Sequence, residues 1–172
     1  MIHIVLVEPE IPQNTGNIAR TCAATGCELH LVEPLGYKLE DRYLKRAGLD
    51  YWPLVKVHVH KDFAEVLSMY PDAPFYYAST KAPRGYAQVE YPEDVFLVFG
   101  KESRGLPENL LERVYDRCIR IPMRPEARSL NLSNSVAIVL YEALRQQRFA
   151  GLKGEGALTG REEADAPWLD YV

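Results

Sequence analysis

Three stretches of the chain concentrate polar side chains directly after runs of apolar residues. Each stretch follows a segment rich in Val, Ile, Leu or Phe and precedes a segment with helical spacing. In α/β proteins, loops of this kind gather at the carboxyl edge of a parallel sheet, which is where ligands bind. We therefore take residues 8–20, 97–107 and 121–135 as the candidate site.

The first loop, EPEIPQNTGNIAR, carries two prolines that stiffen a turn. Asn14 or Thr15 can cap a helix that begins near residue 15, and Gly16 permits close approach of a backbone or a ligand. Arg20 then falls in the second helical turn, near the positive end of the helix, where it can face phosphate or ribose. A capped helix with an exposed arginine explains the same residues without a ligand.

The second loop, LVFGKESRGLP, runs from an apolar strand through Gly100 and four polar residues to Gly105. Two glycines around a charged turn let a ligand approach the backbone. Glu102 can accept a hydrogen bond from a ribose hydroxyl or pair with a nearby arginine. The loop matches neither a P-loop nor a G-x-G-x-x-G fingerprint, which argues against an NAD-type Rossmann enzyme. A plain strand–helix turn is the alternative interpretation.

The third loop, IPMRPEARSLNLSNS, leads into the helix with the clearest periodicity in the chain. Its Ser and Asn side chains, with the free N–H groups of a helix start, can hydrogen-bond an adenine edge or a carboxylate. Ile121, Met123 and Leu130 offer apolar walls for a flat base. A helix needs only one capping residue, so this density of Ser and Asn favours a ligand over an elaborate N-cap.

The elements that position these loops alternate between strand and helix, which predicts an α/β fold with a mostly parallel sheet flanked by helices. Residues 1–150 are expected to form a single domain, followed by an acidic, loose tail at 151–172. Strands are predicted at 2–7, 28–32, 54–59, 74–79, 95–99 and 117–121, and helices at 14–25, 39–47, 61–69, 107–113 and 131–149.

The composition favours a cytoplasmic protein without a metal. Three cysteines without paired spacing argue for a reducing compartment and buried thiols. His58 and His60 share one strand face, but we expect no further ligand beside them, and Cys22 and Cys27 lack a second pair, so no metal site is predicted. No apolar run approaches the roughly 18–20 residues that span a bilayer, so no membrane partner is expected.

The net charge of −4 speaks weakly against a nucleic-acid partner. The acidic tail distorts that average, because residues 151–172 carry two basic and five acidic side chains, a net of −3. The remaining chain is near neutral at −1, and its Arg and Lys residues are clustered. A local basic patch is therefore compatible with the sequence.

Taken together, the three loops resemble the motifs of the SPOUT superfamily of RNA methyltransferases in order and spacing. The matching patterns are N-x-G-N-x-x-R, F-G-x-E-x-x-G-L, and IPM followed by SLNLSN before the last helix. The chain is most similar to the minimal tRNA (cytidine/uridine-2′-O)-methyltransferases of the YibK/TrmL type, which modify the wobble nucleotide. The resemblance covers about residues 1–150.

The resemblance implies a SPOUT fold with a C-terminal trefoil knot, a homodimer, a tRNA substrate, and S-adenosylmethionine (SAM) as methyl donor, with S-adenosylhomocysteine as product. It implies catalytic roles for Arg20 and Tyr141 and substrate contacts at Asn14, Arg124 and Arg128. The further RNA-facing candidates are Lys38, Arg42, Lys45, Arg46 and Arg104. Cofactor contacts are implied at Ala78, Ser79, Thr80, Gly100, Glu102, Ile121, Met123, Ser129 and Leu130.

The implied chemistry is an in-line displacement by a ribose 2′-hydroxyl, which must be aligned and lose its proton. Arg20 is a poor general base because a guanidinium stays protonated. Our hypothesis is that Arg20 grips a phosphate and stabilises alkoxide character, while a phosphate oxygen or Tyr141 takes the proton. Tyr141 as a core aromatic is the alternative. The rival functions are methylation of another RNA, such as rRNA, and a non-catalytic SAM- or RNA-binding module.

Overall fold

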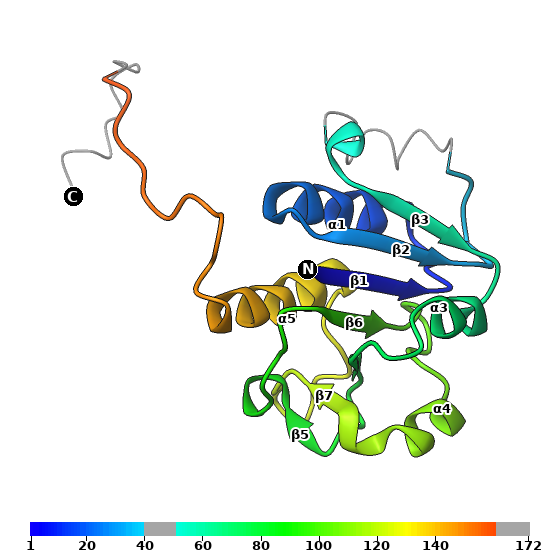
Figure 1. The fold of residues 1–172 in the computed structure, drawn as a ribbon. Helices are drawn as coiled ribbons and strands as arrows, with labels where there is room; N and C mark the ends of the chain where they lie inside the picture. Colours follow the sequence, from blue (N-terminus) through cyan, green and yellow to red (C-terminus); the bar gives the residue numbers. More distant parts are fainter. Residues whose placement is uncertain (40–50, 161–172) are drawn as a thin grey trace.

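The computed structural model describes residues 1–39 and 51–160. In this part of the chain, seven strands form one sheet in the order β3-β2-β1-β6-β4-β7-β5 (Figure 1). Every neighbouring pair is parallel, so the carboxyl ends of all strands meet at one edge. The strands are β1 (Ile2–Val7), β2 (Glu28–Val32), β3 (Val57–His60), β4 (Phe75–Ala78), β5 (Arg84–Gly85), β6 (Val95–Phe99) and β7 (Cys118–Arg120).

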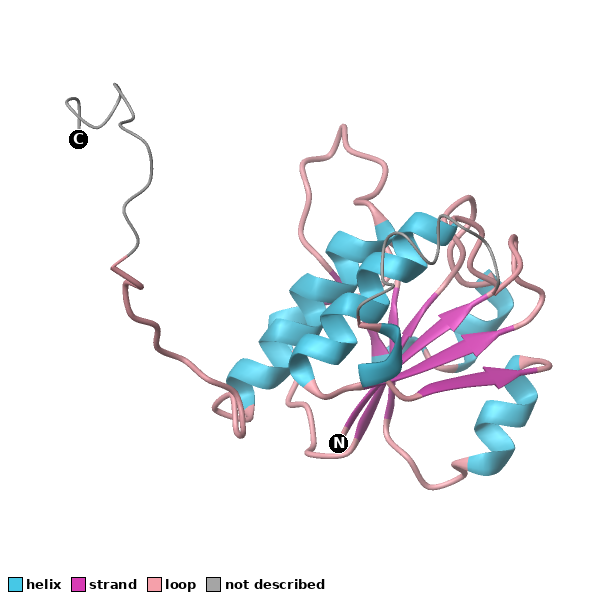
Figure 2. Cartoon of the chain, turned by 90° about the horizontal axis from the view of Figure 1, so that it is seen from above, coloured by secondary structure: helices cyan, strands magenta, loops and turns pink. Residues whose placement is uncertain are grey.

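Helices cover both faces of this sheet (Figure 2). Helices α1 (Pro12–Thr25) and α5 (Leu132–Gln146) pack on the face that carries Ile4, Leu6 and Leu97. Helices α3 (Phe63–Met69) and α4 (Glu108–Arg113) lie on the face that carries Val5 and Val98. Successive side chains of a strand point to opposite faces, so a central strand covered on both sides reads as a continuous apolar run.

The two long helices begin and end for identifiable reasons. Pro12 occupies the start of α1, where its missing N–H costs nothing, and Gly26 ends the helix in the left-handed region at φ 73°. The α5 helix begins at Asn131, whose side-chain oxygen accepts hydrogen bonds from the Ser133 and Asn134 amides at 2.9 and 3.3 Å. The loop before α1 therefore ends at Pro12, and the loop before α5 ends at Asn131.

The predicted α/β class and parallel sheet are confirmed. The strand predicted at 54–59 begins only at Val57, because residues 52–54 form a 3₁₀ turn. The two-residue β5 was not predicted, since so short a strand has no alternation to detect. The helix predicted at 39–47 lies outside the described residues. Beyond α5, Leu152 packs against the core and residues 153–160 run exposed away from the body (Figure 1).

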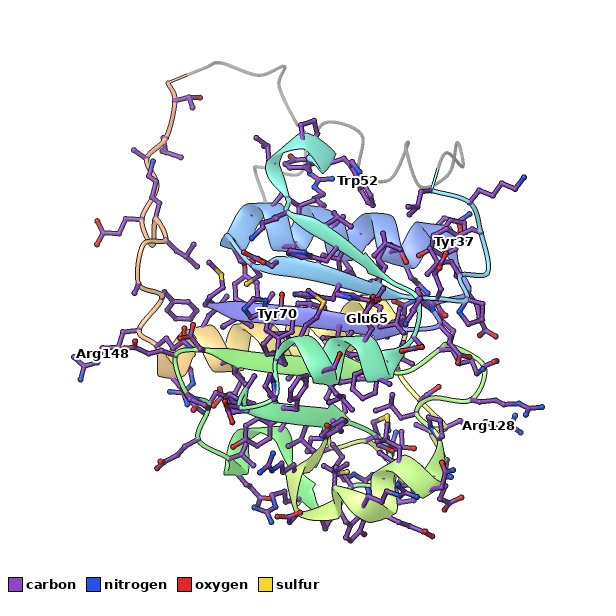
Figure 3. The ribbon with its side chains drawn as sticks, turned by 45° about the vertical axis from the view of Figure 1, so that its right-hand side comes forward. Tyr37, Trp52, Glu65, Tyr70, Arg128 and Arg148 are labelled. Atoms are coloured by element: carbon purple, nitrogen blue, oxygen red, sulfur yellow. The ribbon has the colours of Figure 1, made fainter. Side chains whose placement is uncertain are left out.

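The short α3 helix packs over the middle of the sheet, where its Phe63 ring contacts Phe75 and Tyr77 of β4. Its N-cap Asp62 accepts a hydrogen bond from the Glu65 amide at 2.8 Å. Glu65 and Tyr70, which follow that cap, lie over β1 to β3 (Figure 3).

None of the helices in residues 1–39 and 51–160 is long and apolar enough to cross a bilayer.

Candidate active site

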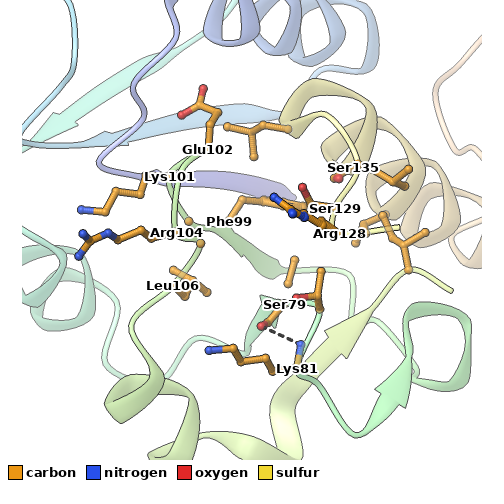
Figure 4. Close-up of a pocket in the computed structure, with 18 of the residues that line it drawn as sticks. Ser79, Lys81, Phe99, Lys101, Glu102, Arg104, Leu106, Arg128, Ser129 and Ser135 are labelled. Atoms are coloured by element: carbon orange, nitrogen blue, oxygen red, sulfur yellow. Dashed lines mark hydrogen bonds between the residues drawn. The ribbon is translucent and has the colours of Figure 1, made fainter. Parts of the chain in front are cut away.

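The loops that follow β4, β6 and β7 meet at the carboxyl edge of the sheet and line one cavity of about 370 Å³ (Figure 4). The segment that leads into α5 closes another side of it. The volume lies within the range of about 300–1,000 Å³ that ligand pockets occupy. All nine residues expected to contact the cofactor line this cavity: Ala78, Ser79, Thr80, Gly100, Glu102, Ile121, Met123, Ser129 and Leu130.

The walls of the cavity combine apolar and basic side chains. Phe99, Ile119 and Ile121 supply apolar surface, which suits a flat aromatic group. Lys81 and Lys101 also line it, but Glu108 and Glu8 respectively pair with their ammonium groups. Two arginines that line it, Arg104 and Arg128, are exposed and have no carboxylate within 4.0 Å in the described part of the chain. The cavity mouth therefore carries positive charge.

Gly100 makes the turn after β6 possible because the backbone returns on itself there. A Cβ atom at this position would lie 2.1 Å from the Gly105 carbonyl carbon and 2.2 Å from the Leu106 nitrogen. The Gly105 amide closes the turn by donating to the Lys101 carbonyl at 2.8 Å. A glycine is required at this position because the backbone of residues 105–106 comes so close. We expected a ligand to approach there, and the neighbour in the structure is the chain itself.

The Glu102 carboxylate binds the loop before α1. It accepts hydrogen bonds from the Glu10 amide at 2.8 Å, the Ile11 amide at 3.2 Å and the Asn14 side-chain amide at 3.0 Å. We expected Glu102 to pair with an arginine or to face a ribose, and in the structure its oxygens instead hold the start of the first helix. The first and second loops are thereby joined across 88 residues of sequence.

Asn14 extends this connection to the third loop. Its side-chain oxygen accepts a hydrogen bond from the Asn131 side-chain amide at 2.9 Å, and Asn131 is the N-cap of α5. The expectation that Asn14 or Thr15 caps α1 was wrong, because the helix already begins at Pro12 and both residues are buried inside it. Asn14 is therefore a link between Glu102 and Asn131 and does not line the cavity.

A second set of contacts fastens the same two loops and was not predicted. Glu10 accepts hydrogen bonds from the Ser103 amide and hydroxyl, both at 2.8 Å, and these bonds lower the pKa of the Glu10 carboxyl. Gly36 also lies close to Glu10, because a Cβ added to Gly36 would come within 2.7 Å of the Glu10 Cα. The alternation of Glu8 and Glu10 opposite Lys101 and Ser103 is the sequence signal that could have indicated it.

The two candidate catalytic residues lie apart from the cavity lining. Arg20 is exposed in the third turn of α1, not the second, and its guanidinium stacks 4.8 Å above the Tyr51 ring. Tyr141 is 47% exposed on α5, so it is not a core aromatic, and its ring lies 6.4 Å from that of Phe149. Both side chains point away from their own chain's core on adjacent helices.

The predicted RNA-facing residues divide into two groups. Lys38, Arg104, Arg124 and Arg128 are exposed, and Arg104 and Arg128 flank the cavity. Arg124 is not among the cavity-lining residues, although its neighbour Met123 is. The remaining candidates, Arg42, Lys45 and Arg46, lie outside the described residues.

A parallel α/β sheet with one cavity at its carboxyl edge defines a ligand-binding α/β protein of the kind that holds a nucleotide or cofactor there. The SpoU rRNA methylase family matches residues 1–141. A tRNA (cytidine(34)-2′-O)-methyltransferase from Saccharophagus degradans is 49% identical over 154 residues, covering 89% of this chain and all of that relative. The chain belongs to the SpoU rRNA methylase family.

Solved structures agree with this assignment. One described as giving insights into the 2-OH methylation of C/U34 on tRNA has a TM-score of 0.83 and 47% identity, covering 86% of this chain and 97% of that chain. An AdoMet-bound rRNA methyltransferase from Sinorhizobium meliloti has a TM-score of 0.75 and 25% identity, covering 84% of this chain but 56% of that one. The resemblance to SPOUT methyltransferases is confirmed.

Proposed function

We propose that this protein transfers a methyl group from SAM to the ribose 2′-oxygen of the wobble nucleotide, cytidine or uridine, in the tRNA anticodon. The observation that carries the proposal is the cavity formed by the loops after β4, β6 and β7, which is lined by every residue expected to contact the cofactor. The relative from Saccharophagus degradans and the C/U34 structure support the choice of substrate. The proposal includes a cytoplasmic location, where a tRNA substrate would be met.

The cavity fits SAM in chemistry as well as in size. Ile121, Met123 and Leu130 give apolar contacts for the adenine, while the Ser79 and Ser129 hydroxyls can hydrogen-bond its polar parts. Bound SAM would supply an electrophilic methyl group. Ala78 ends β4 with a small side chain, which is compatible with a backbone contact to the cofactor.

Arg20 does not line the cavity of its own chain, so in this proposal it serves the cavity of a second copy. Arg20 and Tyr141 project from α1 and α5, whose residues pack together in one core cluster. Tyr141 and Phe149 leave 47% and 40% of their surface exposed, an aromatic patch that a partner can cover. In the proposed homodimer, Arg20 of one chain faces the cavity of the other, grips a phosphate and stabilises negative charge on the 2′-oxygen. Tyr141 or a phosphate oxygen takes the proton.

The proposal includes the trefoil knot within a domain of residues 1–150, with 151–172 as a tail. β7 lies between β4 and β5 near one end of the sheet, whereas α5, which follows it, packs on the central β6. The Gln146 side chain then bonds the Tyr91 amide and the Val89 carbonyl, both at 2.9 Å. The C-terminal segment therefore returns to the sheet centre against the connection that precedes β6, as a threaded segment would.

Labelled methyl transfer from SAM to total tRNA, followed by nucleoside mapping, tests the proposed reaction. We expect 2′-O-methylcytidine or 2′-O-methyluridine at the wobble position. A parallel reaction on rRNA tests the rival substrate, because the rRNA methyltransferase from Sinorhizobium meliloti has a similar fold. Label in rRNA alone would refute the tRNA assignment, and SAM binding without transfer to either RNA would indicate a non-catalytic module.

Mixing two inactive variants tests the dimeric site. Arg20→Ala removes the arginine, and Gly100→Ala disrupts the cavity loop. If Arg20 serves the cavity of its partner, an equal mixture of both chains regains roughly a quarter of wild-type activity through heterodimers. No recovery after subunit exchange would show that Arg20 acts within its own chain. An Arg20→Lys chain that turns over normally would show that a single positive charge suffices.

A further inference from the structure

All four histidines of the chain gather on one face of the sheet, beneath α3. His3 lies on β1, His30 on β2, and His58 and His60 on β3, with Glu28 beside them on β2. We expected no further ligand near His58 and His60, and that expectation was wrong. The parallel register aligns His3 with Glu28 and His30 with His58, so residues far apart in sequence share one face.

The donor atoms of three of these residues converge. His3 Nδ1 lies 3.0 Å from His30 Nε2 and 3.8 Å from Glu28 Oε2. The ligand atoms of His3, Glu28 and His30 all lie within 4.8 Å of one another. Tetrahedral zinc with bonds of about 2.0–2.1 Å separates its ligand atoms by about 3.3 Å. The 3.0 Å and 3.8 Å separations lie within about half an ångström of this value, and the remaining pair must approach by at most about 1.5 Å.

Each of two converging residues has an outer partner that orients it. His30 Nδ1 lies 2.9 Å from His60 Nε2, and His60 Nδ1 lies 3.7 Å from Glu65. Glu28 accepts hydrogen bonds from Lys56 at 2.9 Å and from His58 at 2.7 Å. Metal-binding histidines and carboxylates are held by outer hydrogen bonds of this kind.

The converging side chains are also accessible to a cation. His3 and Glu28 keep 12% and 16% of their side-chain surface exposed, which leaves a path from solvent. The Phe96 ring stacks on His3 at 4.1 Å and closes the inner side.

We propose that His3, Glu28 and His30 form a binding site for a divalent transition-metal ion of the zinc type, with water as a fourth ligand. Two imidazoles and one carboxylate are a ligand set that zinc takes in proteins with an open coordination position. The site lies at β1 and β2 on the α3 face and shares no residue with the cavity at the ends of β4, β6 and β7. It is therefore independent of the proposed methyl transfer.

Calorimetric titration of the untagged, chelator-treated chain with Zn²⁺ tests the site. We expect one ion per chain and a rise in Tm on binding. Glu28→Gln, at the exposed rim, should weaken binding at least about 10-fold, the effect of losing even an outer partner. The matched control is Glu112→Gln, an exposed carboxylate on α4 without a partner in the described part of the chain, which should bind like wild type.

Two outcomes would overturn the proposal. The first is a wild-type protein that binds no Zn²⁺ at micromolar concentrations. The histidines would then form a hydrogen-bonded structural cluster and no metal site. The second is equal Zn²⁺ affinity in wild type and in a Glu28→Gln variant whose circular dichroism matches wild type, which would place the ion elsewhere. Visible absorption of bound Co²⁺ provides a second readout, because a tetrahedral site gives intense bands and Glu28→Gln should lose them.

Discussion

Replacing Gly100 with alanine tests whether the turn after β6 builds the cavity. The added Cβ would lie 2.1 Å from the Gly105 carbonyl carbon, and ordinary contact begins at 3.4 Å, so the backbone must move by about 1.3 Å. Overpacking of this kind costs about 1–3 kcal/mol of stability. The moved segment carries Glu102, and a misplacement of about 1 Å can cost on the order of 10²-fold in rate. We expect a folded protein with at least about 10-fold weaker SAM binding.

Gly105→Ala is the matched control for this substitution. Gly105 has φ +68° and a Cβ there meets nothing within 4 Å, so alanine adds backbone strain of roughly 1–2 kcal/mol without a clash. Urea unfolding should show a similar loss of stability for both variants, whereas calorimetry with SAM should show the larger loss of affinity for Gly100→Ala. A folded Gly100→Ala chain that binds SAM like wild type would refute this account of the turn.

Three further substitutions test the link between the loops and the charge at the cavity mouth. Asn131→Ala should lower stability by about 0.5–2 kcal/mol because α5 loses its cap, whereas Asn134→Ala, an exposed neighbour, should be nearly neutral in thermal unfolding. Asn14→Asp places a carboxylate 3.0 Å from Glu102, so one of the pair acquires a raised pKa. The substitution should lower the free energy of unfolding by about 1–3 kcal/mol at pH 8, and this loss should shrink as the pH falls through the raised pKa. An equal loss in urea unfolding at pH 5 and pH 8 would contradict this prediction. Arg128→Ala should weaken tRNA binding and reduce the salt slope by about one in filter binding, and an unchanged slope would place Arg128 off the RNA path.

The central strands were predictable because a strand that is buried on both faces consists almost entirely of apolar residues. Residues 95–99 are a continuous apolar run and residues 2–7 are interrupted only by His3, and the structure gives strands with those bounds. The strand order was not predictable, because β6 inserts beside β1 after 87 intervening residues and no local pattern records that pairing. The start of α1 was missed by two residues since Pro12 begins a helix without any side-chain cap.

The residues that line the cavity could be predicted from the motifs, because the chemical character of each side chain is known from its residue type. The hydroxyl of Ser129 is polar and the side chains of Leu130 and Met123 are apolar in any fold. The loops at the carboxyl edge of the sheet bring these three residues together in the cavity. The position of Arg20 could not be judged in this way. Its type indicates phosphate binding, but only the structure shows that its helix points it away from the cavity of its own chain.

Asn14 shows why a residue's partners decide its role. A sequence containing Asn at the start of a helix indicates a cap or a substrate contact, since the side chain both donates and accepts. In the fold its amide nitrogen faces the Glu102 carboxylate and its oxygen faces the Asn131 amide, so donor and acceptor are both used within the protein. Aspartate would lack the donor and leucine would lack both groups. The residue type at position 14 is therefore dictated by two residues 88 and 117 positions away. Its hydrogen bonds to them fix the first loop against the two loops that line the cavity.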